Sequence, residues 1–224
     1  MARTVAPMGE RSTIKRQPAR GAYDVTTINA VLDAALVGHV GIAVGERPIV
    51  IPMLYGRDRA IEHPTLYLHG SVASRLARTL ADGVDVCLTA TVVDGLVLAR
   101  SAFHHSMNYR SAVVFGRAVA VEGDELLHGL RCISDHLAPG RWELAREPNE
   151  VELRQTKVLR LTMEEGSAKA RTGGPIDDEA DLAFPAWAGV VPCALTWGDP
   201  IDADDLDPAF AALSPTGAAP PCTA

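Results

Sequence analysis

The sequence predicts a mainly β protein, a β-barrel with peripheral α-helices. Apolar runs rich in Val and Ile recur along the 224 residues, and turn signals follow most of them directly. Few helices are predicted between these runs, which disfavours the alternating βαβ units of a parallel sheet. No G-x-G-x-x-G follows a predicted strand and no G-x-x-x-x-G-K-[ST] occurs, so Rossmann and P-loop chemistry are disfavoured as well.

The first predicted element is an amphipathic helix. Apolar residues recur at i, i+3 and i+4 over residues 28–36, Thr26 is the expected N-cap, and Gly38 is the expected end. Pro48 and Pro52 cannot donate to a strand ladder, so they indicate a sheet edge or a bulge. The elements expected here are strands over 39–44 and 48–55, joined by a hairpin at Gly45-Glu-Arg47.

The rest of the chain adds strands and two further helices. Asp94-Gly95 is the strongest hairpin signal in the sequence, and we expect it to join strands over 84–93 and 96–103. The remaining predicted elements are strands over 111–121, 157–163 and 189–197 and helices over 125–137 and 150–156.

The composition indicates one domain with two loose ends. We expect a basic extended arm over residues 1–24, a single domain over 25–207, and a disordered Ala- and Pro-rich tail over 208–224. The net charge of −7 argues against nucleic acid as a partner. No apolar run reaches the ~18 residues of a membrane span, and four scattered cysteines indicate reduced thiols. A cytoplasmic protein without a membrane partner is therefore expected.

The segment from Leu66 to Arg75 is the first candidate site. A strand there would break at Gly70, and a helix would begin after Ser71 as its N-cap. Ser74 and Arg75 would then lie in the first helical turn, where free N–H groups and the helix dipole favour a phosphate. The alternative is that they cap and solvate a surface helix. Strand alternation divides the preceding residues into two faces: Leu66 and Leu68 in the core, and Tyr67, His69 and Ser71 on the other side.

A second polar patch separates two apolar runs, at residues 101–111. Asn108 and Ser111 suit a polar ring edge, and Tyr109 can stack or donate its hydroxyl. Arg110 can pair with a phosphate or carboxylate in bidentate fashion. The alternative interpretation is a solvated connecting loop.

Neither a dedicated metal site nor a nucleophilic site is expected. His104 and His105 are adjacent, but neighbouring strand residues point to opposite faces, and no H-E-x-x-H or H-x-H spacing occurs. A single histidine, His69, His104 or His105, could serve as an axial haem ligand, since that role needs one imidazole. No G-x-S-x-G elbow occurs, which disfavours a hydrolase.

Several of these segments together resemble a known family. From about Arg11 to Asp204 the chain is similar to the pyridoxamine 5′-phosphate oxidase-like flavin-binding split barrels, in the branch that includes the nitroimidazole-resistance proteins. The segments that carry the resemblance are Ile49-Val-Ile-Pro-Met-Leu-Tyr55, Leu66-Tyr-Leu-His-Gly-Ser71, Ser74-Arg75, Ser101-Ala-Phe-His-His-Ser-Met-Asn-Tyr-Arg-Ser111, Ser167-Ala-Lys-Ala-Arg-Thr-Gly-Gly174 and Trp187-Ala-Gly-Val-Val-Pro192.

The resemblance implies a Greek-key split barrel of the FMN-binding type and a homodimer with FMN at the subunit interface. Arg75 replaces a lysine of many relatives and keeps its charge. The residues that the resemblance implies in cofactor binding are Val50, Ile51, Pro52, His69, Gly70, Ser71, Ser74, Arg75, Asn108, Tyr109, Arg110 and Ser111, with Lys169, Arg171 and Trp187 reaching the cofactor from the partner subunit.

The function expected from this resemblance is an FMN-dependent oxidoreductase that moves a hydride or electrons between a reduced nicotinamide and a small acceptor. The flavin carries that chemistry, so no catalytic side chain is assigned. The C-terminal Arg-x-His-type motif of true pyridoxamine phosphate oxidases is missing, and vitamin B6 oxidation is not expected. The alternatives are an F420-dependent reductase and a non-catalytic protein that carries or senses flavin or haem.

Overall fold

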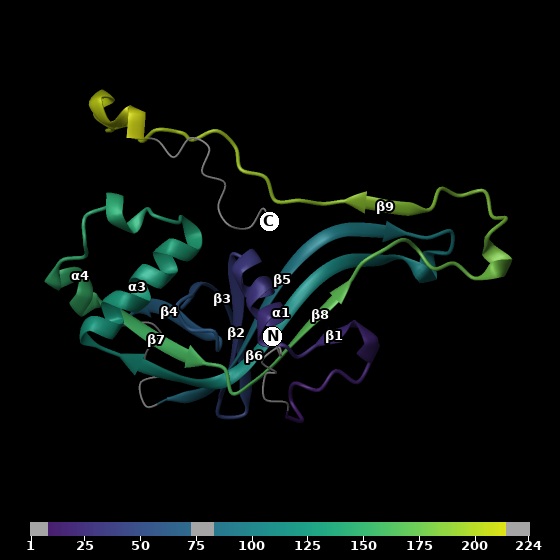
Figure 1. The fold of residues 1–224 in the computed structure, drawn as a ribbon, viewed down its shortest axis with the longest axis horizontal. Helices are drawn as coiled ribbons and strands as arrows, with labels where there is room; N and C mark the ends of the chain where they lie inside the picture. Colours follow the sequence, from purple (N-terminus) through teal and green to yellow (C-terminus); the bar gives the residue numbers. More distant parts are fainter. Residues whose placement is uncertain (1–8, 73–82, 214–224) are drawn as a thin grey trace.

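The structure is a computed structural model that describes residues 9–72 and 83–213 (Figure 1). It is mostly β-sheet with peripheral helices, as the sequence predicts. The strands are β1 (Gly21–Ala22), β2 (Val37–Val44), β3 (Arg47–Arg57), β4 (Thr65–Ser71), β5 (Val84–Leu98), β6 (Ser106–Val121), β7 (Thr156–Thr162), β8 (Glu165–Arg171) and β9 (Gly189–Pro192). The helices are α1 (Val25–Ala34), α3 (Gly123–Leu137) and α4 (Glu150–Gln155), with 3₁₀ turns η1 (Pro18–Arg20), η2 (Ala102–His104), η3 (Trp142–Leu144), η4 (Glu179–Asp181) and η5 (Pro208–Leu213).

Part of this sheet closes into a ring. The antiparallel pairs β2–β3, β3–β4, β4–β7, β7–β6, β6–β5 and β5–β2 return to their starting strand. β6 changes partner along its length, from β8 at residues 109–115 to β7 at residues 118–121. Gly116 lies at the change, where a Cβ would come within 2.2 Å of the Thr162 carbonyl oxygen. Glycine therefore permits this approach, and the fold is the split barrel that the resemblance implies.

Helix α1 packs its apolar face into the main core. Val25, Ile28 and Leu32 are fully buried there, in one cluster with Val40 of β2 and Leu88 of β5. The helix supplies core volume that the ring strands alone would leave open.

The ends of α1 differ from the prediction. Asp24, and not Thr26, is the N-cap, because its carboxylate accepts the Thr27 N–H at 2.9 Å. The helix ends at Ala34, and Gly38 belongs to β2.

Helix α3 lies on the outside of the barrel, against β3, β4 and β7 (Figure 1). Gly56 permits the close contact, since a Cβ there would lie 2.3 Å from the backbone of Cys132. Tyr67 and Ile133 belong to a second, smaller core beneath this helix. The predicted alternation along β4 is confirmed, because Leu66 faces the main core and Tyr67 faces α3.

Strands β5 and β6 extend beyond the barrel as a long ribbon flanked by β8 and β9 (Figure 1). β5 runs through Asp94-Gly95, so the hairpin predicted there is wrong. The register shifts between Val93 and Gly95, and the chain turns instead at residues 99–105. Gly95 serves a long-range contact: a Cβ there would lie 2.8 Å from the Val191 carbonyl oxygen of β9.

Two further elements depart from the predicted strands. β8 is a strand that the apolar pattern does not predict, and β9 ends at Pro192 instead of residue 197. The N-terminal part of the described chain lies along β8, because β1 pairs with it and Arg11 forms an ion pair with Glu165 at 2.7 Å. No helix within the described ranges is long and apolar enough to cross a membrane.

Candidate functional site

The strands that carry the first predicted site separate from each other. β3 and β4 pair only from Tyr55–Leu68 to Arg57–Leu66. Beyond this point, in the part of the chain that the structure describes, residues 47–54 pair with β2 and residues 69–71 pair with β7. These two stretches form what we call the β3/β4 opening. Their backbone groups do not bond across it, so a planar ligand could take hydrogen bonds from both edges.

On the β3 edge of this opening, the predicted residues alternate between surface and core. Val50 is 64% exposed and Pro52 is exposed, whereas Ile51 packs against the main core. Pro52 lies opposite His39 of β2. The predicted placement of the β3 prolines at a sheet edge is therefore confirmed within the described residues.

On the β4 edge, the strand leaves the core as it reaches the opening. Leu68 is fully buried, whereas His69 and Ser71 are exposed and Gly70 is half-buried. The His69 imidazole makes no hydrogen bond or ion pair with any other described residue. The remaining predicted residues of this segment, Ser74 and Arg75, lie outside the described residues, as does the helix expected after Ser71.

Residues of the second predicted patch form a closed hydrogen-bond network on β6 and β8. Arg171 is only 6% exposed, and its Nη1 donates to Asn108 Oδ1 at 2.5 Å and to the Gly173 carbonyl oxygen at 3.1 Å. Its Nη2 donates to the Gly174 carbonyl oxygen at 2.9 Å, and Asn108 Nδ2 donates to Gly173 at 3.1 Å. Both terminal nitrogens of Arg171 and both amide atoms of Asn108 are thus engaged within the chain.

The neighbouring cations also have partners within the chain. Arg110 makes a two-pronged contact with Asp94 at 2.8 and 3.1 Å, and this bonding raises the pKa of the guanidinium. Ser111 Oγ donates to the Lys169 carbonyl oxygen at 3.2 Å, and Lys169 Nζ donates to the Arg16 carbonyl oxygen at 2.8 Å. Asp94 is therefore the counter-ion of Arg110 on β6.

Two hollows of about 160 and 350 Å³ lie beside β8. Arg20 and Ala170 line both of them; Lys169 adds to the first and Arg171 to the second. Arg20 was expected only as part of an extended arm, and no periodic signal in residues 1–24 indicated this position. Lys169, Arg110 and Arg171 beside these hollows already bond to other groups of the chain, and Arg20 is the remaining cation that lines them.

The structure therefore divides the predicted residues into separate sets. One set lines the β3/β4 opening in the barrel ring, and the other lies on the β6 and β8 extension. Tyr109 belongs to the second set, because it pairs with Arg171 in register. Trp187 is 64% exposed and lies against Gly189 at the start of β9.

The family described as "Pyridoxamine 5′-phosphate oxidase" matches the chain over residues 24–170, which is more than half of its length. This range includes α1, the ring strands and both predicted patches. The chain belongs to this family. It is thus a member of a family of flavin-binding split barrels, as its sequence resemblance implies.

Two solved structures of this family's fold resemble the chain over most of its length. The flavocytochrome Anf3 from Azotobacter vinelandii is 38% identical, with a TM-score of 0.81, and the match covers 90% of this chain and 94% of that one. An FAD and haem binding protein from Mycobacterium smegmatis is 31% identical, with a TM-score of 0.79 and coverage of 84% and 91%.

A candidate 5-nitroimidazole antibiotic resistance protein from Bacteroides thetaiotaomicron shares the fold at 23% identity, with a TM-score of 0.53 and coverage of 66% of this chain and 85% of that one. No curated protein sequence matches the chain significantly.

The histidines of this pyridoxamine 5′-phosphate oxidase family member differ in their freedom to bind a ligand. His104 Nε2 lies 3.2 Å from Asp178 Oδ2. His105 Nδ1 accepts the Ala99 N–H at 3.1 Å, which puts the proton of a neutral ring on Nε2, the nitrogen that a haem iron would need. Of the three histidines singled out from the sequence, His69 alone keeps both ring nitrogens unengaged by the described residues.

Proposed function

We propose that this protein is a flavin- and haem-binding redox protein, active as a homodimer, that moves electrons between a reduced nicotinamide and a small acceptor. The observation that carries the proposal is the β3/β4 opening, whose two strand edges do not bond to each other. The two relatives at 38% and 31% identity supply the cofactor pair, because one is a flavocytochrome and the other binds FAD and haem.

The β3/β4 opening suits a flavin ring. Val50, Ile51 and Pro52 pair with β2 on their other edge, and the backbone groups of successive strand residues point to opposite edges, so only every second one of them can face the opening. Pro52 has a carbonyl to offer but no N–H. On the other edge of the opening, Gly70 carries no side chain that would hinder an approaching ring. Ser74 and Arg75 are assigned to the phosphate from their sequence pattern. When bound, the flavin supplies hydride and single-electron chemistry, while the chain binds and orients it. FAD is preferred to FMN as the cofactor because of the Mycobacterium smegmatis relative.

His69 is the residue we assign to the haem iron. An axial ligand needs an imidazole nitrogen that no other group occupies, and among the described residues nothing bonds to the His69 ring at the exposed end of β4. His104 and His105 meet it less well, because each already uses a ring nitrogen within the chain. Arg20, which lines both hollows beside β8, offers a cationic partner for the acidic groups of either cofactor.

A second copy of the chain would complete the site. Val37 and Leu54 are paired neighbours on the outside of β2 and β3, and with Val50 they leave an apolar surface exposed. Trp187 and Trp197 are also more than half exposed. Covering these residues is the expected gain from dimerisation, and a partner's β8 and Trp187 could then approach the β3/β4 opening, which they do not reach in one chain.

An absorption spectrum of the purified protein, before and after loading with FAD, FMN, F420 and haem in separate aliquots, tests this proposal. We expect retained flavin bands, a retained haem Soret band, and bleaching of the flavin by NADH or NADPH. The His69→Ala variant should lose the haem band and keep flavin, whereas His104→Ala should keep both. Failure to retain any flavin would overturn the proposal, and retention of F420 instead would move the protein to the deazaflavin-dependent reductases.

A further inference from the structure

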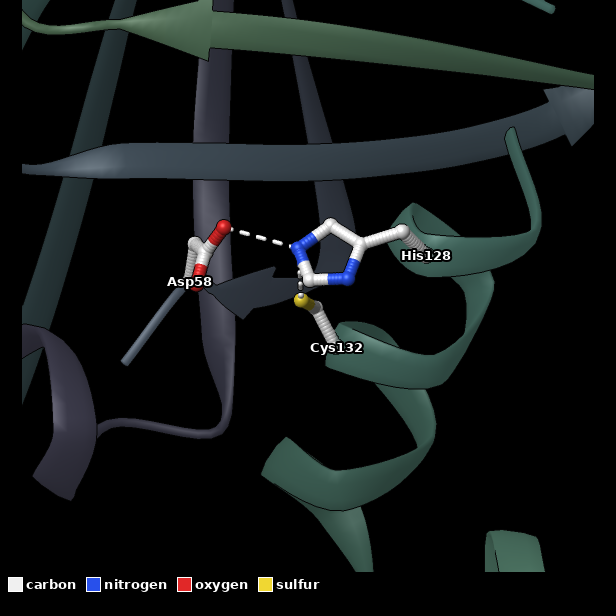
Figure 2. Close-up of side chains that lie close together, drawn as sticks. All are labelled: Asp58, His128 and Cys132. Atoms are coloured by element: carbon white, nitrogen blue, oxygen red, sulfur yellow. Dashed lines mark hydrogen bonds and ion pairs between the residues drawn. The ribbon is translucent and has the colours of Figure 1, made fainter. Parts of the chain in front are cut away.

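Three potential metal ligands converge on the face of the barrel that α3 covers (Figure 2). Asp58 follows the end of β3, and His128 and Cys132 lie one helical turn apart on α3. His128 Nε2 lies 2.7 Å from Asp58 Oδ2 and 3.5 Å from Cys132 Sγ. All three ligand atoms lie within 4.8 Å of one another.

The carboxylate of Asp58 is buried and held in place. Its side chain is 7% exposed, and its Oδ1 accepts the Ala60 N–H at 3.0 Å. The backbone N–H of Asp58 donates to the Thr65 carbonyl oxygen at 2.9 Å, which fixes the start of the loop after β3. Oδ2 is therefore presented to His128 by a rigid support, as an outer-shell hydrogen bond presents a metal ligand.

The same nitrogen of His128 faces both of the other groups. In a Cys-His-Asp relay the carboxylate orients one ring nitrogen while the other faces the thiol. Here Asp58 and Cys132 both approach Nε2, so the arrangement does not form a relay. Convergence of a carboxylate oxygen, an imidazole nitrogen and a sulfur on one point is instead the arrangement of a metal site.

We infer that Asp58, His128 and Cys132 form a zinc site of this protein, separate from the β3/β4 opening. Zn²⁺ takes this mixture of oxygen, nitrogen and sulfur ligands, and three protein ligands leave a fourth position for water or an external ligand. Binding forms the Zn–S bond and releases the thiol proton to solvent.

The two ligand pairs that include His128 need only a small adjustment to bind the ion. Tetrahedral ligands at zinc distances lie ~3.4 to 3.6 Å apart, close to the observed 3.5 Å between Sγ and Nε2. The Asp58–His128 contact must lengthen from 2.7 Å by about 0.7 Å to reach the same range. His128 is 44% exposed and can make this movement, since its ring contacts Tyr67 edge-on and no described residue encloses it.

Metal titration of the purified full-length protein, freed of metal by a chelator, tests the site. We expect one equivalent of Zn²⁺ per chain to bind in competition with a chromophoric chelator. Co²⁺ in its place should give a thiolate-to-cobalt charge-transfer band and the visible bands of a tetrahedral ion. Cys132→Ser should abolish the charge-transfer band, and His128→Ala should weaken Zn²⁺ binding by at least about tenfold.

Matched controls separate this site from others on the chain. Cys87→Ala removes another half-buried cysteine, and His104→Ala removes a histidine beside the carboxylates of Asp178 and Asp181. Both should leave the Co²⁺ spectrum unchanged. The inference is overturned if no equivalent of Zn²⁺ binds, or if Cys132→Ser and His128→Ala, shown to be folded by circular dichroism, bind it as the unaltered protein does. The Co²⁺ bands are recorded as difference spectra against the same protein without Co²⁺, so that any flavin or haem bands cancel.

Discussion

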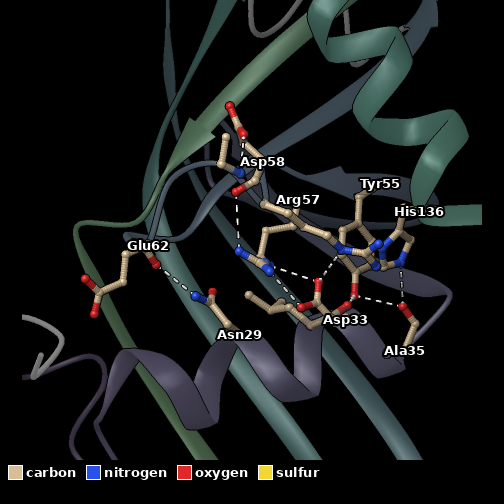
Figure 3. A network of polar contacts seen from close by, with 11 residues as sticks. Asn29, Asp33, Ala35, Tyr55, Arg57, Asp58, Glu62 and His136 are labelled. Atoms are coloured by element: carbon tan, nitrogen blue, oxygen red, sulfur yellow. Dashed lines mark hydrogen bonds and ion pairs between the residues drawn. The ribbon is translucent and has the colours of Figure 1, made fainter. Parts of the chain in front are cut away.

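Strand β3 is closed at one end and open at the other. At its C-terminal end, residues 55–57 pair with β4, Tyr55 and Arg57 bond to α1 residues, and the Tyr55 ring also contacts His136 of α3. Residues 47–54 instead leave the β3/β4 opening on one side. The Tyr55 hydroxyl lies 2.5 Å from the Leu32 carbonyl oxygen and 2.9 Å from that of Ala35. Figure 3 shows Tyr55 beside Ala35.

The closed end joins three elements through buried polar contacts. His136 of α3 bonds through Nε2 to the Ala35 carbonyl oxygen at 2.9 Å, so it helps Tyr55 to satisfy the end of α1 (Figure 3). Arg57 is 9% exposed and donates to both carboxylate oxygens of Asp33, at 2.9 and 2.7 Å. Burial alone would raise the pKa of Asp33, but the bonds from Arg57 outweigh it and lower the pKa. This end therefore stabilises the fold, and the open end is left available for a ligand.

The largest expected effect comes from breaking the closed end. Asp33→Ala leaves the nearly buried Arg57 charge without its partner, and we expect a loss of about 3 kcal/mol in the free energy of unfolding. Urea denaturation measures it. The control is Arg59→Ala, which removes a more exposed partner of the same carboxylate and should cost less than about 1 kcal/mol. Equal costs for the two variants would contradict this account of the closed end.

At the open end, the expected effect is on binding. Arg75→Ala should weaken flavin affinity by about 1.5 to 3 kcal/mol, the value of a charge-assisted phosphate contact, and leave the unfolding free energy nearly unchanged. Fluorescence titration with FAD and FMN measures it, with Arg78→Ala as the neighbouring control. Unchanged affinity would refute the phosphate assignment.

Tyr55→Phe tests the hydrogen bonds of the closed end without creating a cavity. The loss should be about 1 kcal/mol in the free energy of unfolding. The variant loses the hydroxyl contacts with both carbonyl oxygens, but the Ala35 carbonyl oxygen keeps its bond from His136. Tyr23→Phe removes a less buried hydroxyl, which accepts the Ile14 N–H, and should cost less. A Tyr55→Phe variant as stable as the unaltered protein would show that these bonds add no stability.

The pH dependence of stability should also originate at the closed end. Burial lowers the pKa of His136 against the opposing hydrogen bond to Ala35, so the folded chain holds this imidazole neutral. The unfolded chain binds a proton near the ordinary histidine pKa of ~6.5, and stability should fall as the pH drops below that value. Asp33 adds a loss in the same direction in more acid solution. His136→Gln should flatten the decline between neutral and mildly acid pH, and an unchanged decline would assign it to another group.

The smallest expected change in stability is at Val50. Val50→Ser should alter the free energy of unfolding of the monomer by less than about 0.5 kcal/mol, because the side chain is exposed in the single chain. Its effect should appear instead in dimerisation, measured by sedimentation velocity over a range of concentrations. Val40→Ser, at a buried position of β2, is the contrasting variant and should mainly lower stability. Unaltered dimerisation in Val50→Ser would remove this face from the proposed interface.

Local patterns account for the parts of the fold that the sequence predicted. Alternation at Leu66 and Leu68 and helical spacing at Ile28 and Leu32 identified residues that are buried. β8 escaped prediction because Glu-Gly-Ser-Ala-Lys-Ala-Arg has no apolar alternation, and its partners β6 and β1 make it a strand. The hairpin prediction at Asp94-Gly95 failed because both residues make tertiary contacts that the local pattern does not contain. Gly95 allows the close approach of β9, and Asp94 forms an ion pair with Arg110.

By itself the sequence determined the strands of the ring, the helices that pack on it and the family, because burial periodicity and short motifs are local properties of the chain. Only the tertiary structure decided which polar side chains bond to one another within the protein. Arg171 meets Asn108, and Asp58 meets His128 and Cys132, across separations of 63 and about 70 residues. Strand order and the packing of α3 bring these groups together. Neither can be predicted from local sequence patterns, because the residues involved are far apart along the chain.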